Sequence, residues 1–220
     1  MPRLPMPPTN DEAYKKNTKE QYEALGRFVE KFELMVNEVR EVCIDRICSG
    51  IGNSDRQQLI EISFHHQAMT AKPLFDIMRA IIAEIVNKPT SPHHADAANF
   101  KSLLGHIEGE YNHLFHKRNE LLHGTWFIGY VSSNDPDAEE FFLRKYKTSA
   151  DGLVAANELP KNAPELLALK DRCDVLREWI GQVDSCLRDV ESLSEYFKYE
   201  DKTWFFRRLP VAEWTTLPKK

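Results

Sequence analysis

The feature that most constrains the fold is a regular spacing of apolar residues in the long segments of the chain. In the first and last of these segments, apolar residues recur at alternating intervals of three and four positions. The positions are Tyr22, Leu25, Val29, Phe32, Val36, Val39 and Cys43 in the first segment, and Leu166, Leu169, Cys173, Leu176, Ile180, Val183, Leu187 and Val190 in the last. This spacing places the side chains along one side of an α-helix, where they can pack against other helices.

Two further long segments between these have helical patterns of their own. Together the segments predict four helices, at about 12–49, 55–87, 93–123 and 163–197. Pro73 removes a backbone hydrogen bond from the second helix, so we expect a kink or a break near Thr70. Four long helices with similar apolar sides are typical of an antiparallel four-helix bundle, and the predicted fold class is all-α.

The pattern changes between the third and fourth predicted helices. Residues 125–131 are aromatic and β-branched, and residues 141–148 alternate between apolar and other side chains. Turn-forming residues lie between them at 134–137, and a short apolar segment follows at 153–156. We therefore expect a small antiparallel β insertion at about 125–157, with two or three strands.

The two ends of the chain do not follow the helical pattern. Residues 1–11 are rich in proline, which a helix interior does not accommodate, and this predicts an extended N-terminal arm. Residues 198–220 carry many aromatic side chains, which we expect to pack on the bundle or on a partner subunit. The predicted organisation is therefore an arm at 1–11, a bundle at 12–197 that contains the insertion, and an aromatic tail at 198–220.

The charge of the chain limits how it could bind nucleic acid. Its formal net charge is -5 at pH 7, so any RNA contact would need a local basic patch. The candidate basic residues are Lys117, Arg118, Arg144, Lys145, Lys147, Arg207 and Arg208. Each of these short runs is also compatible with ordinary surface charge.

The cysteines and the apolar runs bear on the cellular environment. None of the four cysteines forms a CxxC pair or a zinc-type quartet, and Cys43 and Cys173 fall in the apolar helical positions expected for a core. No run of about 18 apolar residues is present, and the proline-rich start has no hydrophobic region of a signal peptide. We therefore expect a cytoplasmic protein that does not insert into a membrane.

One short motif combines residue types that could cleave a phosphodiester. Arg118, Asn119 and His123 lie at the end of the third predicted helix, directly before Gly124. Arginine holds a phosphate with a planar set of donors, and histidine transfers a proton near neutral pH. Asn119 is one turn before His123 and could orient its imidazole. These residues are sufficient for such chemistry without a metal or another cofactor.

The helical positions of Arg118 and His123 leave several interpretations open. At 100° per residue the two lie roughly 140° apart, and Arg118 falls among apolar residues. Arg118 could form a structural ion pair with a carboxylate such as Glu61 or Glu84, because a buried arginine is unfavourable when unpaired. It could instead extend around the helix toward His123, or lie where the apolar side opens onto a cleft or a subunit interface. His123, directly before a glycine, could also act only as a helix C-cap.

A metal site on the same helix is a weaker hypothesis. His113, His116, Glu120 and His123 share one side of the helix but extend over roughly 15 Å, which is too long for one ion to contact all of them. A pair such as His116 with Glu120 would need a ligand from another helix. We therefore predict no metal site, and treat His116 and Glu120 as candidate supporting residues of the Arg118–His123 site.

The Arg-Asn-x3-His motif at a helix end, in an all-helical chain, resembles the signature of the HEPN superfamily. The wider pattern, with a leucine two residues before His123 and aromatic residues after Gly124, is similar to uncharacterised bacterial HEPN-like proteins. The resemblance covers residues of about 12–197 and implies a homodimer that brings Arg118, Asn119 and His123 of two protomers together. It also implies metal-independent RNA cleavage, with a role in a toxin–antitoxin system or in antiphage defence. Some HEPN toxins have a tyrosine where this chain has Thr125, so control by modification of that tyrosine is not expected here.

Two functional hypotheses therefore follow from the sequence. In the first, the protein is a homodimeric endoribonuclease that acts on RNA, with an antitoxin or another protein as a partner. In the second, it is a non-catalytic helical module that dimerises and binds a protein partner, with Arg118 in a structural role. The location of Arg118 and His123 in the fold distinguishes the two hypotheses.

Overall fold

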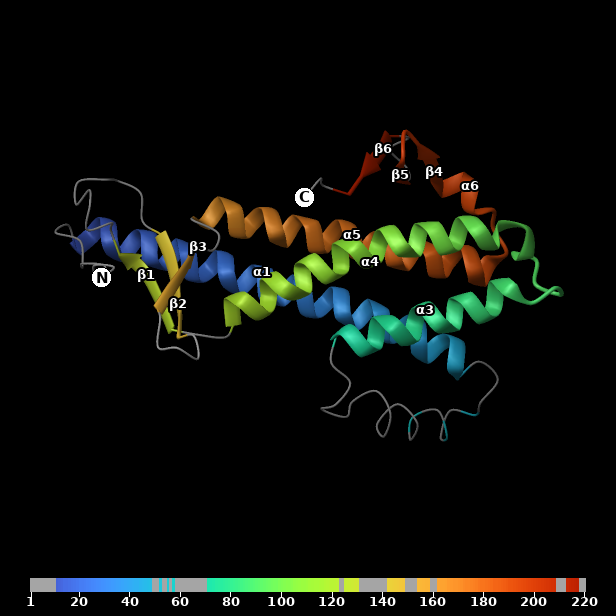
Figure 1. Cartoon of the computed structure of the whole chain (residues 1–220), viewed down its shortest axis with the longest axis horizontal. Coiled ribbons are helices and arrows are strands. Elements are labelled where there is room, and N and C mark those ends of the chain that lie inside the picture. The colour runs from blue at the N-terminus through green and yellow to red at the C-terminus, as the bar shows by residue number, and fades with distance from the viewer. Residues whose placement is uncertain are drawn as a thin grey trace. The chain divides into compact units, whose positions relative to one another are not determined.

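The computed structural model shows a mostly helical chain (Figure 1). It describes residues 11–48, 52, 55, 57, 71–122, 125–130, 142–148, 154–158, 162–208 and 213–217. The long helices are α1 (Asp11–Ile47), α3 (Ala71–Asn87), α4 (Ala97–Leu122) and α5 (Ala163–Asp189). The predicted helical character of the chain is therefore confirmed for the described residues.

The chain divides into two compact units, which are described separately. Unit 1 comprises Met1–Phe32 and His116–Asp171, and unit 2 comprises Glu33–Phe115 and Arg172–Lys220. Helices α1, α4 and α5 contribute residues to both units, whereas α3 belongs to unit 2.

The predicted second helix is described only in part. Asp55 and Gln57 are helical, and α3 begins at Ala71. Residues 58–70, and with them the predicted kink near Thr70, lie outside the described residues, as do residues 1–10 of the predicted arm. Pro73 is the third described residue of α3.

The last predicted helix is not continuous to residue 197, because a break separates α5 from a short helix, α6 (Leu193–Tyr196). Helix α5 ends at Asp189, and Val190 has a φ of 58°. The N–H of Glu191 donates a hydrogen bond of 3.2 Å to the carbonyl of Cys186, as in a Schellman motif. Val190 was expected to continue the apolar side of the helix, but it is 60% exposed because the helix has already ended.

Replacing Val190 by glycine should stabilise the protein, because the backbone at Val190 is strained. A β-branched residue with left-handed backbone dihedrals is unfavourable, and glycine avoids the steric clash. We expect Val190→Gly to raise the free energy of unfolding by about 1 kcal/mol, measured by urea denaturation. Arg188→Gly, at an exposed position within α5, serves as the control and should lower it instead. A loss of stability in Val190→Gly would contradict the role of the positive φ.

The β insertion lies in unit 1, between α4 and α5 in the chain. Strands β1 (Thr125–Tyr130), β2 (Phe142–Thr148) and β3 (Val154–Glu158) form an antiparallel sheet in that order. The change from helical to strand pattern in the sequence predicted strands at these positions. The sheet immediately follows the end of α4, where the Arg118 motif lies.

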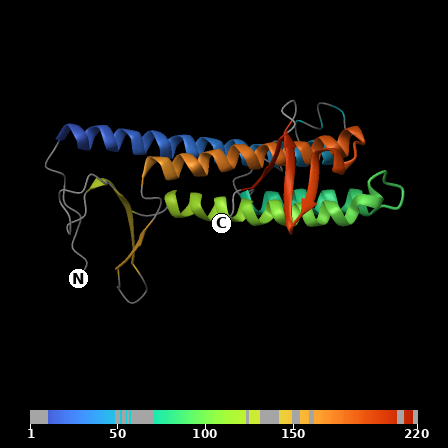
Figure 2. The same ribbon diagram turned by 90° about the horizontal axis from the view of Figure 1, so that it is seen from above.

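The predicted aromatic tail forms a second antiparallel sheet, in unit 2. Its strands are β4 (Phe197–Glu200), β5 (Thr203–Arg208) and β6 (Glu213–Thr216), paired in that order. Seen from above, these strands run across α4 and α5 (Figure 2). The indole N–H of Trp204 donates a hydrogen bond of 3.2 Å to Oγ of Ser102 on α4, so this region packs on its own chain. The aromatic tail was expected to pack on the bundle or on a partner subunit, and its strands were not anticipated.

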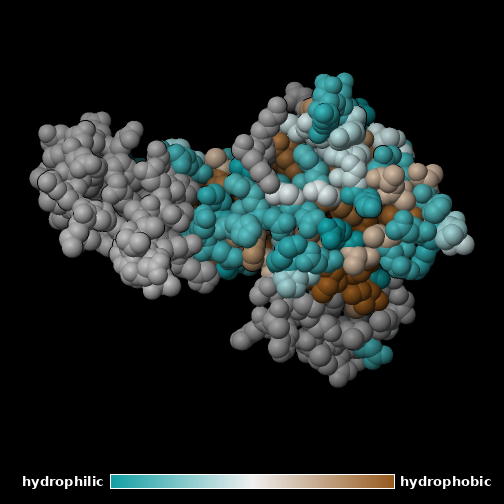
Figure 3. Space-filling model, viewed as in Figure 1, coloured by the Kyte–Doolittle hydropathy of each residue, from teal (hydrophilic) through white to brown (hydrophobic). Residues whose placement is uncertain are grey.

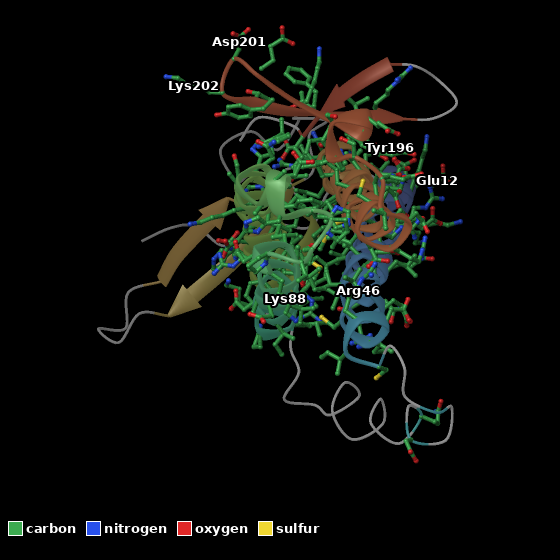
Figure 4. All side chains as sticks on the ribbon, turned by 90° about the vertical axis from the view of Figure 1, so that its right-hand side faces the viewer. Glu12, Arg46, Lys88, Tyr196, Asp201 and Lys202 are labelled. Carbon is green, nitrogen blue, oxygen red and sulfur yellow. The ribbon has the colours of Figure 1, made fainter. Side chains whose placement is uncertain are left out.

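Trp179 of α5 connects the second sheet to the helices of unit 2. The side chain is fully buried, with its ring centroid 5.6 Å from that of Phe197 and 6.0 Å from that of Phe206. On α4, the His106 ring stacks on it at 5.9 Å. The hairpin of β4 and β5 turns away from this core at Asp201 and Lys202, which have φ of 50° and 61° and lie at its outer tip (Figure 4). Two such residues are typical of a type I′ turn.

The apolar spacing of α1 and α5 predicts the core well. Every predicted position on α1 from Phe32 to Cys43 is buried, and so is every one on α5 from Leu166 to Leu187. The predicted positions before Phe32 are not buried: Tyr22 is 58% exposed, and Leu25 and Val29 are half-buried. The buried residues in this part of α1 include Ala24 and Phe28 instead. In Figure 3, hydrophilic residues cover most of the described surface, and apolar residues gather in separate patches. None of the helices described here has the length and apolar character needed to cross a membrane.

Candidate functional site

Arg118 lies in the last two turns of α4 and packs on α1 within unit 1. Its guanidinium carbon is 5.8 Å from the centroid of the Phe32 ring, which places the cation over the aromatic face. The Phe32 side chain is only 1% exposed. The spacing of α4 predicted that Arg118 would lie among apolar residues, and the contact with Phe32 agrees with this.

Asn119 contacts Arg118 in the structure. Its Oδ1 accepts a hydrogen bond of 3.3 Å from a terminal nitrogen of the Arg118 guanidinium. Both side chains are half-buried. The amide oxygen and the Phe32 ring are two neutral groups that restrict how the guanidinium can turn. The predicted contact of Asn119 with His123 is not described, because His123 and Gly124 lie outside the described residues.

The two candidate supporting residues lie in different surroundings. Glu120 accepts a hydrogen bond of 3.1 Å from Nζ of Lys117, and both side chains are about one-third exposed. His116 is exposed, one turn before Glu120 on α4. The predicted basic pair of Lys117 and Arg118 is therefore present at the end of α4, and the Glu120 carboxylate offsets the charge of Lys117.

Glu61 and Glu84 were considered as ion-pair partners that would give Arg118 a structural role. Glu84 does not fit that role, because its side chain is 74% exposed and lies 3.6 Å from Nζ of Lys88, also on the surface. Glu61 lies outside the described residues. The expectation of a buried ion pair between Arg118 and Glu84 is therefore not met.

Two arginines of unit 2 form ion pairs with carboxylates of other helices. Arg172 donates two hydrogen bonds of 2.6 and 2.7 Å to the Glu110 carboxylate, which is 3% exposed. Arg46 likewise donates to Oδ1 and to the backbone carbonyl of Asp184. Such bidentate pairs hold helices together. Sequence analysis missed them, although Glu110 falls three residues after Ile107 on the apolar side of α4, which is an unusual place for a carboxylate.

The cysteine thiols and the positions of metal-ligating residue types bear on other kinds of catalysis. The four cysteines have free thiols and are all buried. Burial raises the pKa of Cys43 to about 12 and that of Cys186 to about 11, so these thiols stay protonated at neutral pH and are poor nucleophiles. In the part of the chain that the structure describes, no three His, Cys, Asp or Glu side chains come together to hold a metal ion.

Comparison with known proteins does not assign the chain to a family. Neither family models, nor curated proteins, nor solved structures gave a match.

Proposed function

We propose that the protein is a HEPN-like, metal-independent RNA endonuclease, with Arg118, Asn119 and His123 in its active site. The observation that supports this best is the way the guanidinium of Arg118 is held. Phe32 lies against one face of it and Asn119 Oδ1 accepts one of its N–H groups, and His123 follows four residues after Asn119 in the sequence. A guanidinium fixed in this way is preorganised to bind a phosphate.

The proposed reaction is transesterification by the neighbouring ribose hydroxyl. The 2′-oxygen attacks the phosphorus, and the bond from phosphorus to the 5′-oxygen breaks. The products are a 2′,3′-cyclic phosphate and a free 5′-hydroxyl, so no metal or external nucleophile is required. His123 accepts the proton of the 2′-hydroxyl or donates one to the leaving oxygen. Arg118 stabilises the negative charge that develops on the phosphate oxygens.

The proposal includes an assembly in which two protomers combine their sites. The four long helices would form an antiparallel bundle, as the apolar sides of α1 and α5 predict. The end of α4 of one protomer would then face that of the other, with two copies of Arg118 and His123 at the interface. RNA would bind there, and an antitoxin or another protein would regulate access.

The test is cleavage of RNA by the pure protein in EDTA, beside a DNA strand of the same sequence. We expect the RNA to be cut into products with cyclic phosphate and 5′-hydroxyl ends, because the reaction needs a 2′-hydroxyl. The DNA should remain intact, and a mock purification should cut neither. Equal cleavage of both strands, or cleavage of RNA that EDTA abolishes, would contradict the proposed mechanism.

A non-catalytic interaction module is the second candidate function. It is favoured by the same contact between Arg118 and Phe32, because a cation on a buried ring also stabilises the packing of α1 on α4. In that case the protein would form a homodimer, or bind another protein, without acting on RNA. Substitutions of Arg118 would then change stability and dimer formation alone.

A further inference from the structure

A groove lies between α3 and α4 in unit 2. Its volume is about 570 Å³. The groove extends along α3 from Asp76 to Asn87 and along α4 from Ala97 to Gly105. Volumes of this size are typical of sites for small organic ligands.

The groove is lined by buried apolar residues and by residues with small side chains. Val86, Phe100 and Leu104 are buried, and they contribute its apolar surface. Small residues from both helices complete the lining, among them Ala83 and Gly105. A Cβ placed on Gly105 would meet no atom within 4 Å, so the space above this residue is open. An unbranched apolar chain could therefore lie along the groove in contact with both helices.

Three charged residues line the groove, namely Asp76, Arg79 and Lys101. Lys72 bridges Asp76 at 2.6 Å and Glu108 at 3.2 Å, and Arg79 also pairs with Glu108. These two cations and two carboxylates cancel one another. Lys101 remains, an exposed cation on α4 that lines the groove. A ligand that matches this arrangement combines an apolar chain with a single negative charge.

We propose that the groove between α3 and α4 binds a monoanionic amphiphile, such as a medium-chain carboxylate. Its apolar chain packs along Val86, Phe100 and Leu104, and its carboxylate pairs with Lys101. This site is independent of the proposed ribonuclease activity, because it shares no residue with the Arg118 motif.

The experiment measures binding of decanoate to the full chain by isothermal titration calorimetry, below its micelle-forming concentration. Gly105→Trp, which fills the groove, should weaken binding by about tenfold or more, because the ligand loses contact area equivalent to several methylene groups. Gly105→Ala should bind as the wild type does, since its methyl group meets open space. Lys101→Glu should weaken decanoate binding by about fivefold, whereas Lys88→Glu, a control outside the groove lining, should not.

Uncharged and cationic ligands of the same length test the role of charge. Decan-1-ol should bind Lys101→Glu and the wild type equally, and decyltrimethylammonium should bind the wild type more weakly than decanoate does. Circular dichroism confirms that each variant is folded. Undetectable decanoate binding by the wild type, unchanged binding in Gly105→Trp, or equal binding of the cation and the anion would overturn the proposal.

Discussion

Trp179→Ala is expected to lower the free energy of unfolding by about 3–5 kcal/mol, the usual effect of removing a large aromatic side chain from a core. Trp179 is fully buried and contacts the rings of His106, Phe197 and Phe206. Its loss would leave a cavity between α4, α5 and the second sheet. Guanidinium denaturation, followed by circular dichroism, measures the change.

Trp179→Phe is the matched control for this prediction. The indole nitrogen of Trp179 is buried without a hydrogen-bond partner among the described residues. Phenylalanine keeps an aromatic ring in the core and removes this polar group, so we expect a much smaller loss of stability than with alanine. If both variants were as stable as the wild type, the second sheet would not depend on Trp179 for its packing.

Arg118→Ala is expected to lower the rate of RNA cleavage by about 10²–10³-fold, as removal of a group that stabilises developing charge typically does. Stability should fall much less, by about 1 kcal/mol, because the contact with Phe32 is a single cation–π interaction. Rates come from a labelled RNA under single-turnover conditions, and stability comes from urea denaturation. The proposed function requires the large effect to be on the rate.

Two further variants separate charge from packing at this position. Arg118→Lys keeps the positive charge but loses the planar donors, so it should recover part of the activity. Arg27→Ala removes an exposed arginine on α1 in the same unit and should leave the rate unchanged. If Arg118→Ala unfolded the protein while Arg118→Lys had normal stability and no effect on any RNA, the residue would be structural.

The sequence predicted the helices of the fold better than their ends. Apolar spacing identified buried positions such as Phe32 and Cys173, because that pattern depends only on local helix geometry. It also continued to Val190, past the true end of α5. The usual signal for a helix end is a glycine with positive φ, and here a β-branched residue adopts that conformation. No glycine therefore marks the residue at which α5 ends.

The second sheet illustrates a different limit. Aromatic residues such as Trp204 and Phe206 favour β-strands, but the turn at Asp201 and Lys202 contains no glycine or asparagine to mark a hairpin. The same strands depend on packing against Trp179, which is distant in the sequence. Local pattern predicted that these side chains would be buried, but not the structure that buries them.

The surroundings of Arg118 were predicted in part. Helical geometry placed Arg118 on the apolar side of its helix, but the aromatic partner on α1 could not be identified without the tertiary structure. Asn119 was expected to orient His123, and the contact seen is with Arg118. The groove between α3 and α4 was not anticipated, because small residues such as Ala83 and Gly105 carry no signal for a binding site in a sequence.

The most direct test of the proposed function is RNA cleavage in EDTA by the wild type and by His123→Ala, with His94→Ala as the control. His94 is an exposed histidine of unit 2, away from the motif in the sequence. We expect His123→Ala to lose about 10²–10⁴-fold in rate while it remains folded, because proton transfer is lost. His94→Ala should retain the wild-type rate. A folded His123→Ala variant that cleaves RNA as fast as the wild type would contradict the proposed role of His123.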